Sequence, residues 1–96
     1  MAKIAFQARA RANLEKIELF IAAEHPAAAS ETLELIFDAI AILERHPLIG
    51  RPAEEGLREL VISQGRSGYV ALYEYLEADD LVAILAIRHQ RESGYP

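Results

Sequence analysis

The chain has 96 residues, no cysteine, 52% hydrophobic residues and a formal net charge of −5 at pH 7. This length fits one domain, residues 1–96, and the missing cysteines exclude disulfides and thiolate metal sites. No apolar run reaches the ~18 residues of a membrane helix, and the first residues do not read as a signal peptide. We therefore expect a cytoplasmic protein without membrane contact.

Charge is distributed unevenly along the chain. Residues 1–12 contain three basic side chains and no acid, whereas residues 13–59 are strongly acidic. A general nucleic-acid binder should show a basic face. The pattern therefore argues against general nucleic-acid binding but allows one small cationic site.

The first two predicted elements are a short strand and a helix. Residues 3–7 alternate apolar and polar side chains, which is typical of a strand with one buried face. Residues 8–24 carry apolar side chains at helical spacing, namely Leu14, Ile17 and Ile21. This helix should end before Pro26, because the residue preceding a proline avoids helical backbone angles.

Pro26 suits the first turn of a second helix, which should run to about residue 45. The short connection makes the two helices antiparallel neighbours. Leu35 and Ile42 lie nearly opposite the main apolar stripe, where they can contact the first helix, a second copy or a partner. The main stripe contains Ala29, Leu33, Ile36, Phe37, Ile40 and Leu43.

Three strands are predicted after the helices. Residues 46–52 read HPLIGRP, and two prolines with a glycine stop the helix there. Residues 57–63 and 69–76 alternate along their length and are joined by a glycine-containing turn, as in a hairpin. Residues 81–87 form an unbroken apolar run, which is typical of a strand buried on both faces.

The predicted fold class is α+β with the order β-α-α-β-β-β. The last three strands form a meander because the turns between them are short. A helical hairpin should cover one face of a small, mainly antiparallel four-stranded sheet, since its apolar stripes need a partner surface. The first strand can join either edge of that meander.

The residues that follow the last strand form the candidate site. They are Arg88, His89, Arg91 and Tyr95, and the meander should bring Arg66 of the hairpin turn to the same end. Arginines there can bind a phosphate or an acidic partner, the histidine can transfer a proton, and the tyrosine can stack on a base. Strand ends also collect charge simply because they are solvated, so none of these residues identifies a function alone.

No metal or cofactor is expected. The three histidines, His25, His46 and His89, lie on different predicted elements, and no glycine-rich phosphate loop is present.

The chain resembles the RelE/ParE family of toxins from bacterial type II toxin–antitoxin modules. The resemblance rests on HPLIGRP, LRELVI, GYVALYEYL and LVAILAIRHQRESGY, and it extends over essentially the whole chain. It implies a toxin of a plasmid stabilisation module that is neutralised by a cognate antitoxin, its expected partner. A homo-oligomer is also compatible with the sequence.

The resemblance implies two activities. RelE-like members cut messenger RNA on the ribosome without a metal, and by this resemblance His89, Arg91 and Tyr95 would be catalytic. ParE-like members poison DNA gyrase and need no such catalytic set. The residues that would then contact the target or a partner are Arg66, Arg88, Arg91, Tyr95, Leu35 and Ile42.

Two departures favour the ParE-like branch. The strand LRELVIS has no lysine, and Gly68-Tyr69 is followed by Val70 where RelE-like members carry an arginine. A metal-free ribonuclease must stabilise a dianionic transition state with such cations. We therefore expect a non-enzymatic gyrase binder. The alternatives are a ribosome-dependent endoribonuclease, or an antitoxin-binding relic that is no longer toxic.

Overall fold

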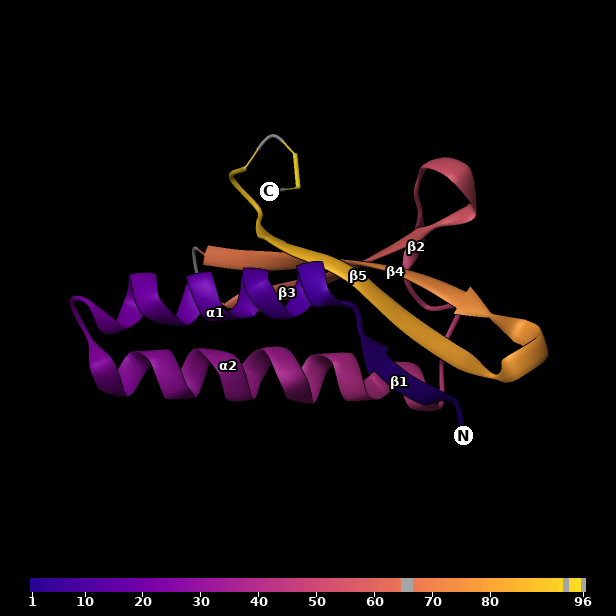
Figure 1. Cartoon of the computed structure of the whole chain (residues 1–96), viewed down its shortest axis with the longest axis horizontal. Coiled ribbons are helices and arrows are strands. Elements are labelled where there is room, and N and C mark those ends of the chain that lie inside the picture. The colour runs from indigo at the N-terminus through magenta and orange to yellow at the C-terminus, as the bar shows by residue number, and fades with distance from the viewer. Residues whose placement is uncertain (65–66, 93, 96) are drawn as a thin grey trace.

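The computed structural model describes residues 1–64, 67–92, 94 and 95. Figure 1 shows the helices on one face of a sheet and the C-terminal segment on the other. The helices are α1 (Ala8–Ala22) and α2 (Pro26–Ala41), and a 3-10 turn, Ile42–Glu44, follows α2. The strands are β1 (Lys3–Phe6), β2 (Arg51–Pro52), β3 (Arg58–Gln64), β4 (Ser67–Leu76) and β5 (Leu81–His89).

The α+β class and the helical hairpin are confirmed, but among the described residues the sheet contains five strands and not four. Their order is β1-β5-β4-β3-β2. The additional strand β2 pairs Arg51 with Glu59 and Pro52 with Arg58. It forms because a residue before proline favours extended backbone, so Arg51 enters the sheet edge directly after the turn.

Strand β1 joins the meander beside β5 and runs parallel to it, from Lys3 opposite Leu81 to Phe6 opposite Ile84. Of the two edges that the sequence left open, the chain therefore uses the β5 edge. This placement encloses the apolar run between β1 and β4, which confirms that it is a strand buried on both faces. Val82 and Ile84 are completely buried.

Strand β5 extends beyond the predicted end at residue 87. Arg88 pairs with Val70 and His89 pairs with Tyr69, so both candidate residues belong to the sheet and not to the tail. Near its middle the register with β4 shifts, and the pairing passes over Leu85. This β-bulge changes which side chains face the helices in the second half of the strand.

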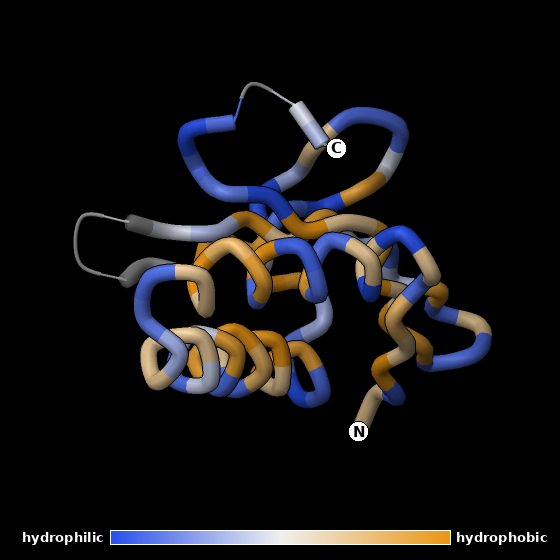
Figure 2. The backbone as a smooth tube through the Cα atoms, turned by 60° about the vertical axis from the view of Figure 1, so that its left-hand side comes forward, coloured by the Kyte–Doolittle hydropathy of each residue, from blue (hydrophilic) through white to orange (hydrophobic). Residues whose placement is uncertain are grey.

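One hydrophobic core fills the space between the helices and the sheet. In Figure 2 apolar segments line this space, whereas the C-terminal segment on the far side is largely hydrophilic. The largest fully buried side chains of the core cluster are Ile36, Ile40, Leu43, Tyr73, Val82, Ile84 and Ile87. Because of the bulge, Ile84 and Ile87 both belong to this cluster although three positions separate them.

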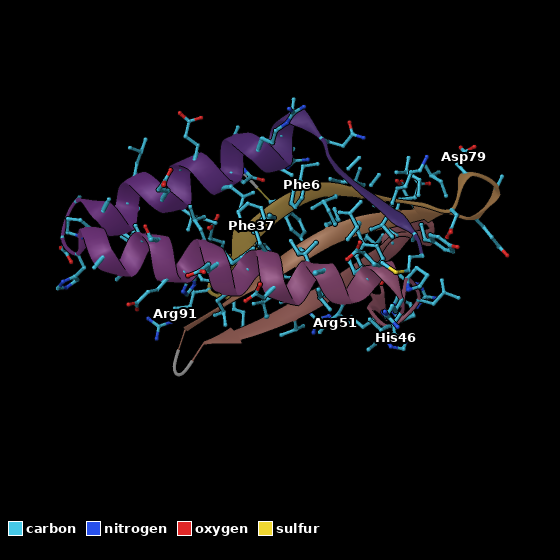
Figure 3. The ribbon with its side chains drawn as sticks, turned by 90° about the horizontal axis from the view of Figure 1, so that it is seen from below. Phe6, Phe37, His46, Arg51, Asp79 and Arg91 are labelled. Atoms are coloured by element: carbon cyan, nitrogen blue, oxygen red, sulfur yellow. The ribbon has the colours of Figure 1, made fainter. Side chains whose placement is uncertain are left out.

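The helices differ from the prediction at their ends and at one apolar position. Helix α2 ends at Ala41, and only the 3-10 turn continues toward the predicted end near residue 45. Helix α1 ends two residues early, at Ala22, and Phe37 of α2 is 46% exposed where the sequence predicted a core position. The Phe37 ring meets Phe6 of β1 edge-on, with centroids 5.6 Å apart (Figure 3). Leu35 packs partly against the core, whereas Ile42 is 48% exposed.

The HPLIGRP turn is held by a buried tyrosine of β4. The Tyr73 hydroxyl donates to the Pro47 carbonyl at 2.8 Å and accepts from the Gly50 N–H at 2.9 Å. Arg58 Nη1 donates to the carbonyls of Leu48 and Gly50. The turn therefore has a defined backbone, and it delivers Arg51 to the edge of the sheet.

Candidate functional site

The candidate residues at the end of β5 lie on two faces of the sheet. Arg88 faces the side away from the helices, and His89 faces the helical side beside Tyr69, whose ring its own meets edge-on at 5.3 Å. Arg91 follows on the helical side and Tyr95 folds back over the opposite side. Arg66 lies outside the described residues.

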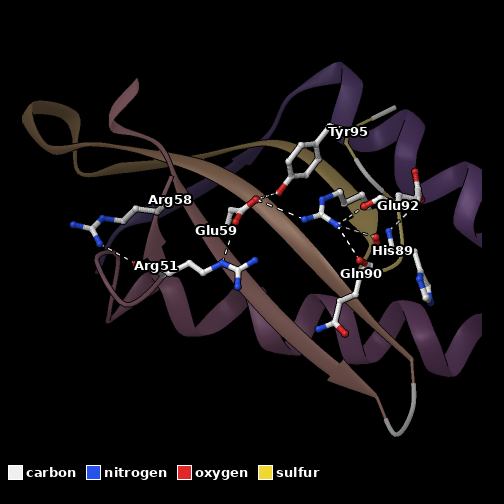
Figure 4. Close-up of polar contacts among 9 residues, drawn as sticks. Arg51, Arg58, Glu59, His89, Gln90, Glu92 and Tyr95 are labelled. Carbon is white, nitrogen blue, oxygen red and sulfur yellow. Dashed lines mark hydrogen bonds and ion pairs between the residues drawn. The ribbon is translucent and has the colours of Figure 1, made fainter. Parts of the chain in front are cut away.

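On the side away from the helices, three donors surround one carboxylate (Figure 4). Arg51 Nε lies 3.0 Å from Glu59 Oε1, and the Tyr95 hydroxyl donates to Glu59 Oε2 at 2.7 Å. Arg88 Nη2 lies 4.0 Å from the same Oε2. We call these four residues the Glu59 cluster. Glu59 and Arg88 are only 16% and 15% exposed, so water screens their ion pair weakly.

Arg88 also holds the C-terminal segment against the sheet. Its Nη1 donates to the carbonyls of His89, Gln90 and Glu92, and its guanidinium carbon lies 5.1 Å from the centroid of the Tyr95 ring. From α1, Arg9 Nη2 donates to the Tyr95 carbonyl at 3.0 Å. The predicted tail is therefore folded back onto the sheet.

The Glu59 cluster shifts the proton affinities of its members in opposite directions. The hydrogen bond from Tyr95, helped by Arg51 and Arg88, lowers the pKa of Glu59 below its usual value despite partial burial. Burial, followed by the hydrogen bond to the Glu59 carboxylate, raises the pKa of Tyr95 to about 12. At neutral pH Glu59 is thus charged and Tyr95 is a neutral donor.

A spectroscopic titration tests this assignment. The ultraviolet absorbance of tyrosinate, measured as wild type minus Tyr95→Phe, should rise near pH 12. Glu59→Gln should move this rise toward 10, because the carboxylate that favours the neutral phenol is gone. Since the folded pKa is the higher one, the stabilisation by Tyr95 should be complete below pH 10 and lost as the pH approaches 12. A rise already at 10 in the wild type would contradict the cluster.

On the helical side, His89 and Arg91 line a groove of about 800 Å³ between α1 and the end of β5. Lys16 contributes a third basic side chain to the lining, and Glu92 contributes an acidic one. The ring of Phe20, which also lines the groove, is 82% exposed. The groove therefore has an apolar part, formed by Ile17, Phe20 and Ile21 of α1, and basic side chains from both α1 and the end of β5. Leu35 and Ile42 do not line it.

The His89 ring is held by its neighbours. Its Nδ1 accepts from the Arg91 backbone N–H at 3.1 Å, and the His89 backbone N–H donates to Glu92 Oε1 at 3.2 Å. An accepting Nδ1 leaves Nε2 as the protonated nitrogen of the neutral ring. Beneath the groove, buried Asn13 of α1 accepts from the Ile87 N–H at 2.9 Å and so joins α1 to β5 where β1 has ended.

The sequence reasoning missed several residues of this region, above all Glu59 and Arg51. One signal was present: the alternation of LRELVIS places Glu59 on the same face as Leu57 and Val61. A charge among apolar positions is rarely buried unless it is paired, so it predicts a cationic partner. The sequence did not indicate which arginines would reach it.

Among the described residues, no group of three or more histidine, aspartate and glutamate side chains is arranged to hold a metal ion. In the same part of the chain, no helix has the length and apolar character needed to cross a bilayer.

Comparison with known proteins assigns the family. A family model described as the ParE toxin of the type II toxin–antitoxin system parDE matches residues 4–94. The chain belongs to the ParE toxin family. It is thus a toxin of a type II toxin–antitoxin system, and the resemblance inferred from its sequence is confirmed.

Relatives of this ParE-family toxin carry both ParE and RelE names. Toxin RelE3 of Caulobacter vibrioides is 36% identical over 84 residues, which cover 88% of this chain and 89% of that protein. The chromosomal ParDE system of P. aeruginosa shares the fold, with a TM-score of 0.75 at 23% identity, covering 91% of this chain and 94% of that one. The toxin–antitoxin complex RelBE2 of Mycobacterium tuberculosis has a TM-score of 0.62 at 25% identity, covering 93% and 98%.

Proposed function

We propose that this toxin acts in the cytoplasm by binding DNA gyrase, without an enzymatic step, and that a cognate antitoxin neutralises it. The family match names the parDE system, and the solved relatives are described as toxin–antitoxin assemblies. The resemblance to ParE-like toxins supplies gyrase as the target. The residues proposed to contact the target or partner remain Arg66, Arg88, Arg91, Tyr95, Leu35 and Ile42.

The Glu59 cluster supports a non-enzymatic mechanism most directly. A metal-free ribonuclease needs cations and donors that are free to stabilise a developing dianion. In the described part of this chain, the Tyr95 hydroxyl and the guanidinium of Arg51 are instead bound to a carboxylate, with Arg88 beside it. A phosphate approaching this cluster would also meet the negative charge of Glu59.

The ribosome-dependent endoribonuclease remains the second candidate because of the groove on the helical side. Lys16, His89 and Arg91 line its basic part, and a histidine beside cations is suited to proton transfer at a phosphodiester. The relative named Toxin RelE3 is consistent with this candidate. On this reading Tyr95 would have to leave Glu59 before it could contact RNA.

Two assays on the same purified protein separate the candidates. With DNA gyrase and relaxed plasmid, we expect loss of supercoiling. With translating ribosomes, primer extension should show no new cuts in the message. Codon-linked cuts that disappear in Arg91→Ala, with normal supercoiling, would establish the ribonuclease.

The Arg91→Ala variant is a suitable probe because the Arg91 side chain is exposed, so its removal should not affect folding. Lys3→Ala, which removes an exposed cation from the sheet edge, is the matched control and should behave like the wild type in both assays. If neither assay responds and strong expression without antitoxin leaves growth normal, the protein is a non-toxic antitoxin partner.

A further inference from the structure

The Glu59 cluster carries more positive than negative charge. Arg51 comes from β2, Arg88 from β5 and Tyr95 from the C-terminal segment, and all three converge on one side chain of β3. Two guanidinium groups against one carboxylate leave an excess of one positive charge. Arg88 Nε is in addition buried, with no hydrogen-bond partner among the described residues.

Two arginines and a hydroxyl donor are the groups that proteins use to bind phosphate. The guanidinium fork matches an oxyanion through parallel hydrogen bonds, and a short O–H···O bond completes the set. Carboxylate and phosphate oxygens accept from the same donors. The Glu59 carboxylate therefore stands where a phosphate oxygen would otherwise bind.

Each donor residue is also anchored by a contact outside Glu59, although Arg51 Nε and the Tyr95 hydroxyl themselves bond to Glu59. Arg88 is held by the carbonyls of the C-terminal segment, and Tyr95 is tied to α1 through Arg9. Arg51 lies in a strand whose backbone pairs with β3, and its side chain is 56% exposed. Removing the carboxylate should thus leave Arg88 and the backbones of Arg51 and Tyr95 in place. It should free Arg51 Nε and the Tyr95 hydroxyl for an external anion that enters on the exposed Arg51 side.

We propose that Arg51, Arg88 and Tyr95 form a binding site for a phosphate group, and that the chain's own Glu59 occupies this site at rest. The carboxylate acts as an internal ligand that excludes external phosphate. This inference goes beyond the gyrase proposal and does not depend on it. It is consistent with that proposal because an occupied site gives the wild type little affinity for phosphate.

The test is a gain of binding in Glu59→Ala. Titrating inorganic phosphate into the full chain, followed by NMR, should show at least about tenfold tighter binding than in the wild type, the scale of one charge-assisted contact. Arg88→Gln in the same background should remove the gain. A second arm with a short single-stranded RNA asks whether a phosphodiester is accepted as well as free phosphate.

The matched control is Glu31→Ala, which changes net charge equally at an exposed position of α2. An equal gain there would show a general charge effect and overturn the proposal, as would the absence of a gain in a folded Glu59→Ala protein. If Glu59→Ala does not fold, Glu59→Gln keeps the side-chain volume and removes the charge. No gain in that variant would likewise overturn the proposal.

Discussion

Replacing Gly50 with alanine should lower the free energy of unfolding by about 2–4 kcal/mol, the combined scale of overpacking and of lost buried hydrogen bonds. A Cβ atom at position 50 would lie 2.6 Å from the Cε1 and hydroxyl oxygen of Tyr73 and 2.8 Å from the carbonyl oxygen of Glu59. Tyr73 is completely buried and cannot move aside without opening the core. Urea denaturation of the two proteins measures the difference.

Gly94→Ala is the control for this prediction. A Cβ atom at position 94 meets nothing within 4 Å, so the substitution should change stability by no more than about 0.5 kcal/mol. Equal stability of the Gly50 and Gly94 variants would show that the turn does not approach Tyr73 as closely as described. Because Gly50 precedes Arg51, the Gly50 variant should also lower the apparent pKa of Tyr95 by loosening the Glu59 cluster.

Replacing Ile84 with alanine should destabilise the protein by about 2–5 kcal/mol, the range for deleting a buried isoleucine and leaving a cavity. Ile84 is completely buried in β5, where it pairs with β1 and β4 and faces the helices. Such a loss is a large part of the stability of a small domain. Urea unfolding monitored by circular dichroism gives its size.

Ile49→Ala removes the same atoms at a position that is 58% exposed in the HPLIGRP turn. We expect a change within about 0.5 kcal/mol there, because little buried surface is lost. Similar values for the two isoleucine variants would be incompatible with a β5 strand enclosed on both faces. Ile49→Ala also leaves the backbone hydrogen bonds of the turn intact.

Much of the fold can be predicted from local patterns in this chain. The uninterrupted run 81–87 has no polar position to present to water, so it had to lie inside a sheet. The link between the helices is too short for any arrangement except a hairpin. The motif HPLIGRP predicted a turn. The contacts that hold this turn are not local, because the Tyr73 hydroxyl bonds to Pro47, 26 residues away in sequence, and to Gly50, 23 residues away.

Other features depend on contacts that no local pattern records. The four residues of β1 do not indicate which strand they pair with. Their place beside β5 depends on how the helical hairpin of α1 and α2 packs on the sheet. Strand β2 is too short for a periodic signal. Likewise, the position of Glu59 among apolar residues predicted a cationic partner, but only the folded structure shows that Arg88 and Tyr95 lie beside it.

What the sequence by itself determined is the set of chemical groups at the end of β5 and the strand that holds them. Which face each group occupies was decided only by the tertiary structure. Side chains alternate along a strand with a period of two, so one unpaired residue reverses every position beyond it. The bulge at Leu85 does this, placing Arg88 on the face of Glu59 and His89 on the face of the helices.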